Sequence, residues 1–173
     1  FDGDLSFSLK ITSGGEMNVG ADDVCKITIV DNDHPLSFIL GAYNATGDNY
    51  WDGPVEWTME LRKDGSDVNT VWFFNLFQDD SFASDNTMYY GIVSDDKTTI
   101  TIPLGQTSEY TYSNGKPITL LGFDGSGGYD SGDIVVAIED DGKTLNFGTE
   151  YGIWAWIEGA GNLNIIKPGI IAT

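Results

Sequence analysis

Cysteine, histidine and basic residues are scarce in this sequence. It has one cysteine, Cys25, one histidine, His34, and 8 lysine and arginine residues against 27 aspartate and glutamate residues. A single cysteine excludes an internal disulfide, and a zinc site built from several cysteine or histidine ligands is excluded by the same shortage. The net charge of −19 repels phosphate backbones and anionic lipids, so we expect neither nucleic acid nor membrane surfaces as partners.

Long apolar runs are missing as well. No stretch approaches the ~20 apolar residues that a membrane-spanning helix needs, so we expect no membrane insertion. Apolar residues still make up 40% of the chain, which is enough for a packed core and argues against general disorder. Because the chain begins at Phe1 and not at methionine, we expect it to be a piece of a longer protein.

Apolar and polar residues alternate with a period of two through most of the sequence. The alternating segments are 5–12, 25–29, 55–62 and 99–102. Four further segments are apolar on both sides: TVWFFNLF (70–77), MYYGIV (88–93), DIVVAI (133–138) and YGIWAWI (151–157). Successive side chains of a strand point to opposite faces, so these patterns predict strands. Turn signals rich in Gly, Asp and Asn lie between the segments, and no segment has a convincing helical period.

The pattern predicts an all-β fold, with an antiparallel up-and-down barrel or sandwich of about ten strands over residues 36–173. Trp57 is in phase with the other apolar residues of its segment, so we expect it to be buried. Trp154 and Trp156 share one strand face, which would be either core or the lining of a pocket. We favour the core for this face.

The stretch DNDHP (31–35) reads as a seam between two domains, 1–34 and 36–173, because its proline removes a backbone donor from any strand pairing. The first domain supplies only two strands, and an isolated hairpin is marginal in water. Its apolar face needs a partner layer: the flank of the second domain, an upstream fragment or a second copy of the chain. We favour a homodimer through the hairpin, since pairing two copies would bury both apolar faces.

The segments SFSLKI (6–11) and ITIVDND (27–33) carry an alternating strand and a strand that ends in an acidic cluster. Together they resemble the last two strands of a Calx-β domain, over residues 4–33. The resemblance implies a two-strand fragment of a β-sandwich, from an extracellular adhesion or spacer module. Some members of the family bind calcium, and Asp31 and Asp33 fall on the acidic cluster of the family.

A second resemblance covers residues 36–173. It rests on FILGAYNATG, MYYGIVSDDKTTITIPLGQ, DIVVAIEDDGKTLNF, YGIWAWIEGAG and IIKPG. These segments look like a domain of Bacteroidetes surface lipoproteins, with blocks related to those of lipocalin-like barrels. The resemblance implies a β-barrel or sandwich and an extracellular, cell-surface location as an outer membrane lipoprotein of a Gram-negative bacterium. It implies no reaction.

Residues that could perform catalysis are few. His34 precedes a proline in the seam and Cys25 lies on what reads as the buried face of a strand, so we interpret them as a linker histidine and a core cysteine. Among 27 acidic residues, some pair will reach the spacing of glycosidase carboxylates by chance. We therefore expect no catalytic residues and no enzyme, and keep a carbohydrate-active enzyme as a second alternative only.

Calcium is the one cofactor candidate. The stretch DGSGGYDSGD (124–133) offers three carboxylates and many backbone carbonyls, the oxygen ligands that a hard cation takes, although it lacks the EF-hand spacing. A solvated loop without metal is the competing interpretation, because aspartate is common in turns. The candidate metal ligands are Asp124, Asp130, Asp133, Asp31 and Asp33.

The loop GDNYWDGP (47–54) places two aromatic residues among polar neighbours. Exposed flat rings beside hydrogen-bonding groups can stack on a sugar ring. The alternative is that the rings fold back over the mouth of a barrel. The candidate ligand-binding residues are Tyr50, Trp51, Asp48 and Asn49.

The favoured function is a non-catalytic module for binding or adhesion at a cell surface, with a glycan or a surface protein as candidate partners. The alternative is a purely structural domain of a surface assembly, which calcium would rigidify.

Overall fold

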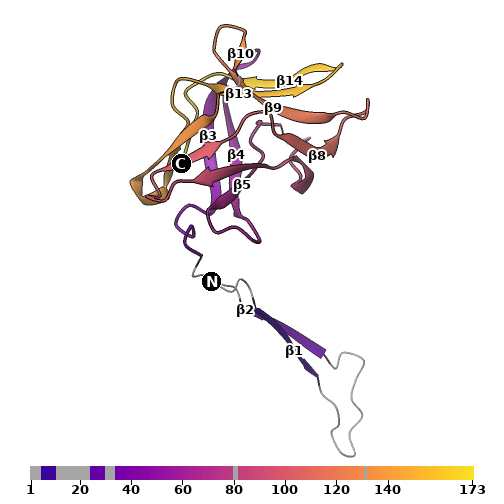
Figure 1. The fold of residues 1–173 in the computed structure, drawn as a ribbon, viewed down its shortest axis with the longest axis vertical. Coiled ribbons are helices and arrows are strands. Elements are labelled where there is room, and N and C mark those ends of the chain that lie inside the picture. The colour runs from indigo at the N-terminus through magenta and orange to yellow at the C-terminus, as the bar shows by residue number, and fades with distance from the viewer. Residues whose placement is uncertain (1–4, 11–23, 30–33, 80–81, 131) are drawn as a thin grey trace, which may run out of the picture. The chain divides into compact units, whose positions relative to one another are not determined.

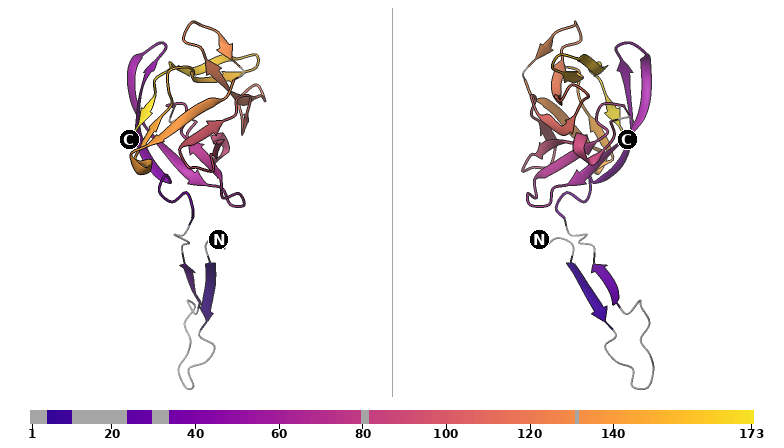
Figure 2. Two further views of the ribbon diagram at one scale, coloured as in Figure 1. Left: turned by 60° about the vertical axis from the view of Figure 1, so that its left-hand side comes forward. Right: turned by 90° about the vertical axis from the view of Figure 1, so that its right-hand side faces the viewer.

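The computed structural model describes residues 5–10, 24–29, 34–79, 82–130 and 132–173. The chain divides into two compact units, Phe1–Ser37 and Phe38–Thr173 (Figure 1, Figure 2). Strands form both units, and the helical elements of the described ranges are two short 3-10 helices, η1 (Asp85–Thr87) and η2 (Asp140–Gly142). None of these ranges contains a helix with the length and apolarity needed to cross a membrane. The prediction of an all-β fold is confirmed.

The first unit contains a two-stranded antiparallel sheet of β1 (Leu5–Lys10) and β2 (Val24–Ile29). Leu9 lies opposite Cys25, so both belong to the apolar face of the hairpin. In the described part of the chain this face is open: Phe7 and Leu9 are 46% and 57% exposed, and Cys25 is exposed. Our interpretation of Cys25 as a core residue is therefore wrong, because two strands supply no second layer that could bury it. The homodimer stays a prediction.

In the second unit, eight antiparallel strands close into a barrel. Around the ring they follow the order β3–β4–β5–β6–β7–β11–β12–β15, and β15 pairs with β3 again. The sequence left a barrel and a sandwich open, and the structure is a barrel. The chain leaves the ring between β7 and β11 and again between β12 and β15 to form further strands. The ring consists of β3 (Gly41–Asn49), β4 (Gly53–Lys63), β5 (Thr70–Phe74), β6 (Tyr89–Val93), β7 (Thr99–Ile102), β11 (Ile134–Glu139), β12 (Thr144–Asn146) and β15 (Ile171–Ala172).

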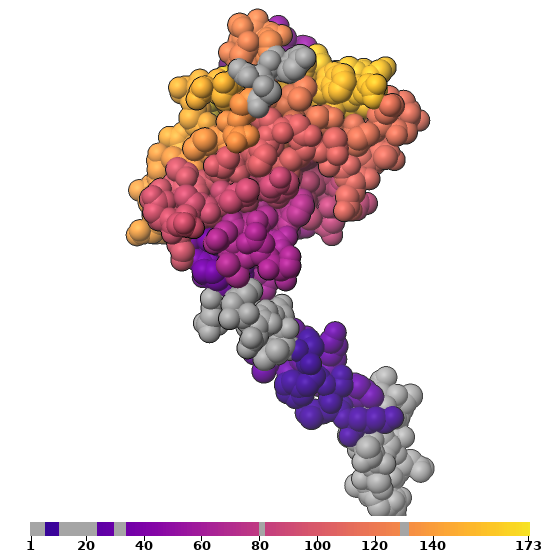
Figure 3. Space-filling model, in the orientation of Figure 1, coloured from indigo at the N-terminus to yellow at the C-terminus, as the bar shows by residue number. Residues whose placement is uncertain are grey.

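Five strands extend the sheet beyond the ring: β8 (Thr107–Thr111), β9 (Pro117–Phe123), β10 (Tyr129–Asp130), β13 (Gly152–Ile157) and β14 (Gly161–Ile166). β14 joins β3 through the pair Ile166↔Asn49. β13 follows β14, and β9 follows β13 and pairs with β8 and β10. In Figure 3 the orange surface around β9 and β10 meets the yellow surface of β14. The strands outnumber the ten or so expected, because β10, β12 and β15 have only 2 or 3 residues, too few for a visible period.

The barrel interior is filled by alternate residues of its strands. In β4, Trp57, Met59 and Leu61 are 8%, 0% and 1% exposed, whereas Glu56 and Thr58 are exposed. Trp57 is therefore buried as predicted, because a strand that is covered on one face buries every second side chain.

The predicted core face of β13 is wrong. Ile153, Ala155 and Ile157 are 1%, 0% and 2% exposed, whereas Trp154 and Trp156 are only half-buried. The branched side chains face the core, and the two tryptophans lie on the outer face of the strand.

Tyr43 connects η2 to the start of β3 through its hydroxyl group. Its hydroxyl oxygen lies 2.8 Å from the carbonyl oxygen of Ile39 and 2.7 Å from that of Gly142, and its single proton is shared between these two acceptors. Its side chain is buried, at 5% exposure, and burial raises the pKa of Tyr43 from 10.0 to about 12. A buried phenolate would lose both hydrogen bonds as well as its hydration.

Alkaline pH is expected to weaken the hydrogen bonding of the Tyr43 hydroxyl. Because the folded-state pKa of Tyr43 lies above its unfolded value, the stabilisation is complete below pH 10 and is lost as the pH rises toward 12. Between these values the wild-type protein should lose on the order of 1–2 kcal/mol more of its free energy of unfolding than Tyr43→Phe does. Urea unfolding of both proteins at pH 8, 10 and 11.5 measures this difference. Parallel pH profiles would contradict the prediction.

Candidate functional site

Tyr50 and Trp51 form the turn between β3 and β4. They are 49% and 54% exposed, and their ring centroids lie 5.6 Å apart at an interplanar angle of 83°. The Oδ1 atom of Asn49 accepts hydrogen bonds from the backbone N–H groups of Trp51, at 3.0 Å, and Asp52, at 3.3 Å. An asparagine that receives these two bonds fixes a turn locally, so both rings stand at the surface on a defined backbone.

The extension of the sheet supports the turn from below. The ring of Tyr50 packs edge-to-face on Phe123 of β9, with centroids 5.6 Å apart, and Phe123 is only 1% exposed. Phe123 in turn contacts Trp154 of β13 at 6.2 Å. The backbone N–H of Tyr50 donates to the carbonyl oxygen of Ile165 at 2.9 Å. Trp51, Tyr50, Phe123 and Trp154 thus form a continuous aromatic cluster from solvent to core.

The two polar residues predicted for this site have different surroundings. Asp48 is partly exposed, and its Oδ2 atom lies 3.1 Å from Nζ of Lys167. Asn49 is 2% exposed, and its Nδ2 atom donates to Asn164 Oδ1, at 2.7 Å, and to Gln78 Oε1, at 3.2 Å. Asn49 therefore supports the turn from inside, and ligand contact by these residues and the two rings stays a prediction.

The candidate calcium loop begins directly after Phe123, beside this aromatic cluster. The Oδ1 atom of Asp124 accepts hydrogen bonds from the backbone N–H groups of Ser126, at 2.7 Å, and Gly128, at 3.0 Å. The bond from Ser126 is the main cause that lowers the pKa of Asp124. Within the structure this carboxylate organises the turn of its own loop.

The other candidate metal ligands lie in different parts of the chain. Asp133 is exposed, Asp130 ends β10, and Asp31 and Asp33 lie outside the described residues. Over the described ranges, no three His, Cys, Asp or Glu side chains are grouped so that they could hold a metal ion. Calcium binding stays a prediction for both places.

His34 differs from our expectation of a linker residue. It is only 3% exposed, its Nδ1 atom accepts a hydrogen bond from the backbone N–H of Leu36 at 3.1 Å, and its carbonyl oxygen accepts one from Ser37 at 2.9 Å. The histidine orders the turn that follows it.

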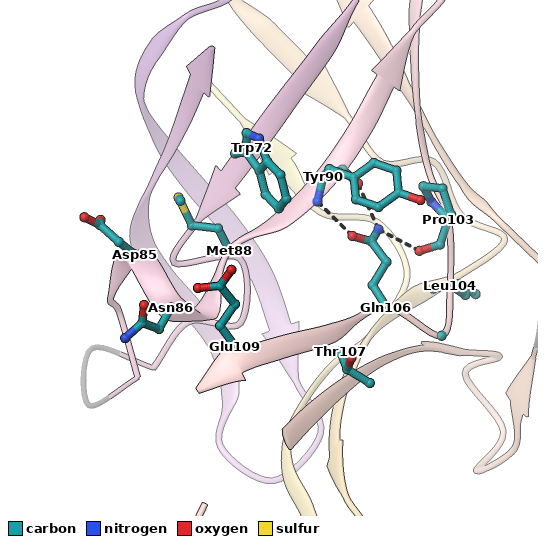
Figure 4. A pocket seen from close by; sticks show the side chains of 11 residues that line it. Trp72, Asp85, Asn86, Met88, Tyr90, Pro103, Leu104, Gln106, Thr107 and Glu109 are labelled. Carbon is teal, nitrogen blue, oxygen red and sulfur yellow. Dashed lines mark hydrogen bonds between the residues drawn. The ribbon is translucent and has the colours of Figure 1, made fainter. Parts of the chain in front are cut away.

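A second aromatic surface was missed in the sequence. A hollow of about 690 Å³ lies on the outer face of the barrel, and Figure 4 shows the side chains that line it. It lies between β5 and β6 on one side and β8 on the other, and is closed at its ends by η1 and by the loop that follows β7. We call it the β5–β8 groove. Its lining residues are Trp72, Asp85, Asn86, Met88, Tyr90, Pro103, Leu104, Gly105, Gln106, Thr107 and Glu109.

The side chain of Gln106 builds one wall of this groove. β7 ends at Ile102 and is followed by Pro103, so the proline cannot donate a backbone hydrogen bond to β6. Gln106 replaces the missing strand: its Oε1 accepts from the backbone N–H of Tyr90, and its Nε2 donates to the carbonyl oxygen of Tyr90, both at 2.9 Å. A further bond from Nε2 to the Pro103 carbonyl, at 2.8 Å, fixes the amide.

Asp64 fixes the indole ring of Trp72 on the same side of the groove. The indole Nε1–H of Trp72 donates to Asp64 Oδ2 at 2.8 Å. This bond, followed by those from the backbone N–H groups of Ser66 and Asp67, holds the pKa of Asp64 well below its usual range. Trp72 and Tyr90 are cross-strand neighbours. Both phases of these two segments are apolar in the sequence, so the period of two placed Trp72 and Tyr90 on strands but did not show that their face turns outward.

The chain therefore offers two aromatic surfaces of different character, an exposed turn and a groove. Comparisons with protein-family models, curated proteins and solved structures found no match to this chain.

Proposed function

We propose that this chain is a non-catalytic binding module of a cell surface, and that Tyr50 and Trp51 contact a glycan. The observation that carries the proposal is the half-exposed ring pair on a buried base: Trp51 is 54% and Phe123 is 1% exposed. Rings whose backbone and base are already fixed lose little conformational entropy when a ligand stacks on them. Asp48, two residues before Tyr50, is the acidic member of the proposed set, and its Oδ2 atom is paired with Lys167.

We further propose that the chain belongs to a cell-surface lipoprotein. The resemblance of residues 4–33 to a Calx-β domain and of residues 36–173 to Bacteroidetes surface-lipoprotein domains supports an extracellular module of an outer membrane lipoprotein. In such a protein the hairpin would belong to a preceding adhesion or spacer domain, and the barrel would present the ring pair.

A purely structural domain is the second candidate. The packed barrel interior favours it, because side chains such as Phe73 and Ile100 at 0% exposure fill the space in which a lipocalin-like barrel would hold a ligand. If that function is the correct one, the surface rings serve packing between domains and bind no glycan.

Trp51→Ala is expected to weaken glycan binding at least about five-fold, because a stacked ring contributes roughly 1 kcal/mol. A glycan array identifies the sugar, and calorimetric titration of wild type and variant measures the loss. Phe38→Ala is the matched control, since Phe38 is also exposed, at 39%, but precedes the other end of β3. If no glycan on the array bound, the purely structural function would be favoured. If wild type and Trp51→Ala bound the glycan with equal affinity, Tyr50 and Trp51 would not be the binding site.

A further inference from the structure

The β5–β8 groove combines two fixed ring faces with an acidic rim. The centroids of Trp72 and Tyr90 lie 5.9 Å apart and their planes meet at 69°, so the rings form two walls of a corner and not one flat platform. A corner of this kind presents two π-faces to one small group.

Hydrogen bonds outside the ring faces hold this corner in place. Asp64 receives the indole N–H of Trp72, and Gln106 pairs with the backbone of Tyr90. The indole ring of Trp72 and the backbone that carries the Tyr90 ring are therefore fixed before a ligand binds, which lowers the entropic cost of binding.

The charge of the groove is negative. Its lining contains the carboxylates of Asp85 and Glu109 and no lysine or arginine. Arg62 lies next to Asp85, with Nη1 2.6 Å from Oδ1, and its Nη2 is 2.7 Å from Glu60, so this cation is committed to the rim beside η1. Glu109 is exposed, and Figure 4 shows its carboxylate directed from β8 toward the side of the groove that holds Trp72 and Met88.

These features select for a positive ligand. A cation within about 6 Å of a tryptophan or tyrosine ring is attracted by the negative face of the ring, and a carboxylate on the opposite side adds a direct charge interaction. The net charge of −19 raises the local concentration of cations around the whole molecule. A neutral sugar would gain nothing from either effect.

We propose that the β5–β8 groove binds an organic ammonium group, which packs against Trp72 and Tyr90 and pairs with Glu109. The ammonium belongs either to a small free cation or to a lysine side chain of another protein. This site is separate from the ring pair at Tyr50 and Trp51 and does not depend on the glycan proposal.

The test is a calorimetric titration of the whole chain with choline and with 3,3-dimethyl-1-butanol, its uncharged carbon isostere. Choline is expected to bind measurably more tightly than the isostere, and more weakly as sodium chloride is added. A titration with the peptide acetyl-Gly-Lys-Gly-amide distinguishes the two sources of the ammonium group: tighter binding of the peptide assigns a lysine side chain, and tighter binding of choline assigns a small free cation.

Two variants locate the bound ammonium. Glu109→Gln removes the carboxylate and keeps its shape, and Tyr90→Leu removes one ring but leaves the backbone pairing with Gln106. Each is expected to weaken choline binding about two- to five-fold. Asp95→Asn is the control: it removes the same charge at an exposed turn between β6 and β7 and should leave the affinity unchanged.

The indole N–H signal of Trp72, assigned by its loss in Trp72→Phe, gives an independent readout and should shift with choline and not with the isostere. Equal binding of choline and its isostere would overturn the proposal. It would also be overturned if Glu109→Gln and Asp95→Asn had the same effect, or if choline did not bind at all.

Discussion

Replacement of Trp57 by alanine is expected to lower the free energy of unfolding by about 3–5 kcal/mol. The indole is 8% exposed and shares its face of β4 with Met59 and Leu61, which are 0% and 1% exposed. Truncation would leave a cavity, and a barrel closed by strand pairing on every side has little freedom to collapse into it.

The truncation would also remove a hydrogen bond. Nε1–H of Trp57 donates to the carbonyl oxygen of Asn75 at 3.1 Å, and Asn75 is held in the left-handed region, at φ 55°. Its Nδ2 donates to the Thr58 carbonyl at 2.9 Å, so β4 and the residue after β5 are tied together twice. Loss of the indole leaves only the hydrogen bond from Asn75 to the Thr58 carbonyl.

Trp51→Ala is the matched control for this experiment, because it makes the same substitution at a tryptophan that is 54% exposed and should cost less than about 1 kcal/mol. Urea unfolding, followed by circular dichroism, measures both variants against wild type. A cost below about 1 kcal/mol for Trp57→Ala would mean that Trp57 does not belong to the core.

The fold was predictable where the pattern is local. Each strand with a regular period of two, such as β4, determines by itself which of its side chains share a face. Trp57 was assigned correctly for this reason, as was the antiparallel all-β class.

The sequence of a strand does not by itself determine which of its two faces joins the core, and the prediction for Trp154 and Trp156 failed for this reason. In YGIWAWI both faces of β13 are apolar, and the larger side chains suggested the wrong face. Ile153 and Ala155 are buried because β13 pairs with β9 on one edge and β14 on the other, and the orientation of that three-stranded unit decides which side chains point inward. No residue within β13 encodes this.

The two candidate sites differ in the same way, because one is formed by neighbouring residues in the sequence and the other by distant ones. Tyr50 and Trp51 follow each other in one turn, so the loop composition was enough to propose them. The groove needs Trp72, Tyr90 and Glu109 from three strands, and Gln106 to replace a missing strand. Only the tertiary arrangement, which places β8 from outside the ring beside β5 and β6, brings these residues together. Asn49 was proposed as a ligand because of its neighbours, but its amide is directed toward Asn164 and Gln78, which are far away in sequence.

The substitution Gly152→Ala is expected to cost about 3 kcal/mol, at the upper end for overpacking. Gly152 is the first residue of β13 and pairs with Phe123 of β9. A Cβ atom at this position would collide with the carbonyl oxygen of Ile166 and with the backbone of Lys167 and Pro168. Because all three contacts are with backbone, no rotation of a side chain can relieve them, and the strand ends must separate.

That separation would also disturb the exposed ring pair. The backbone N–H of Lys167 donates to the Asp48 carbonyl at 2.8 Å, and Tyr50 N–H donates to the Ile165 carbonyl at 2.9 Å, so the segment displaced by the new methyl group holds the β3 side of the turn. Under the proposed function, Gly152→Ala should therefore weaken glycan binding even at temperatures where the protein remains folded.

Gly65→Ala provides the control, since an added Cβ there meets no atom within 4 Å, and its free energy of unfolding should stay within about 0.5 kcal/mol of wild type. Chemical unfolding gives the stability of both variants, and the indole N–H signal of Trp51 in the folded state reports the turn. If Gly152→Ala were as stable as Gly65→Ala, the close approach of β13 to the end of β14 would be refuted. If it were destabilised with an unchanged Trp51 signal, the barrel would hold the turn without help from β14.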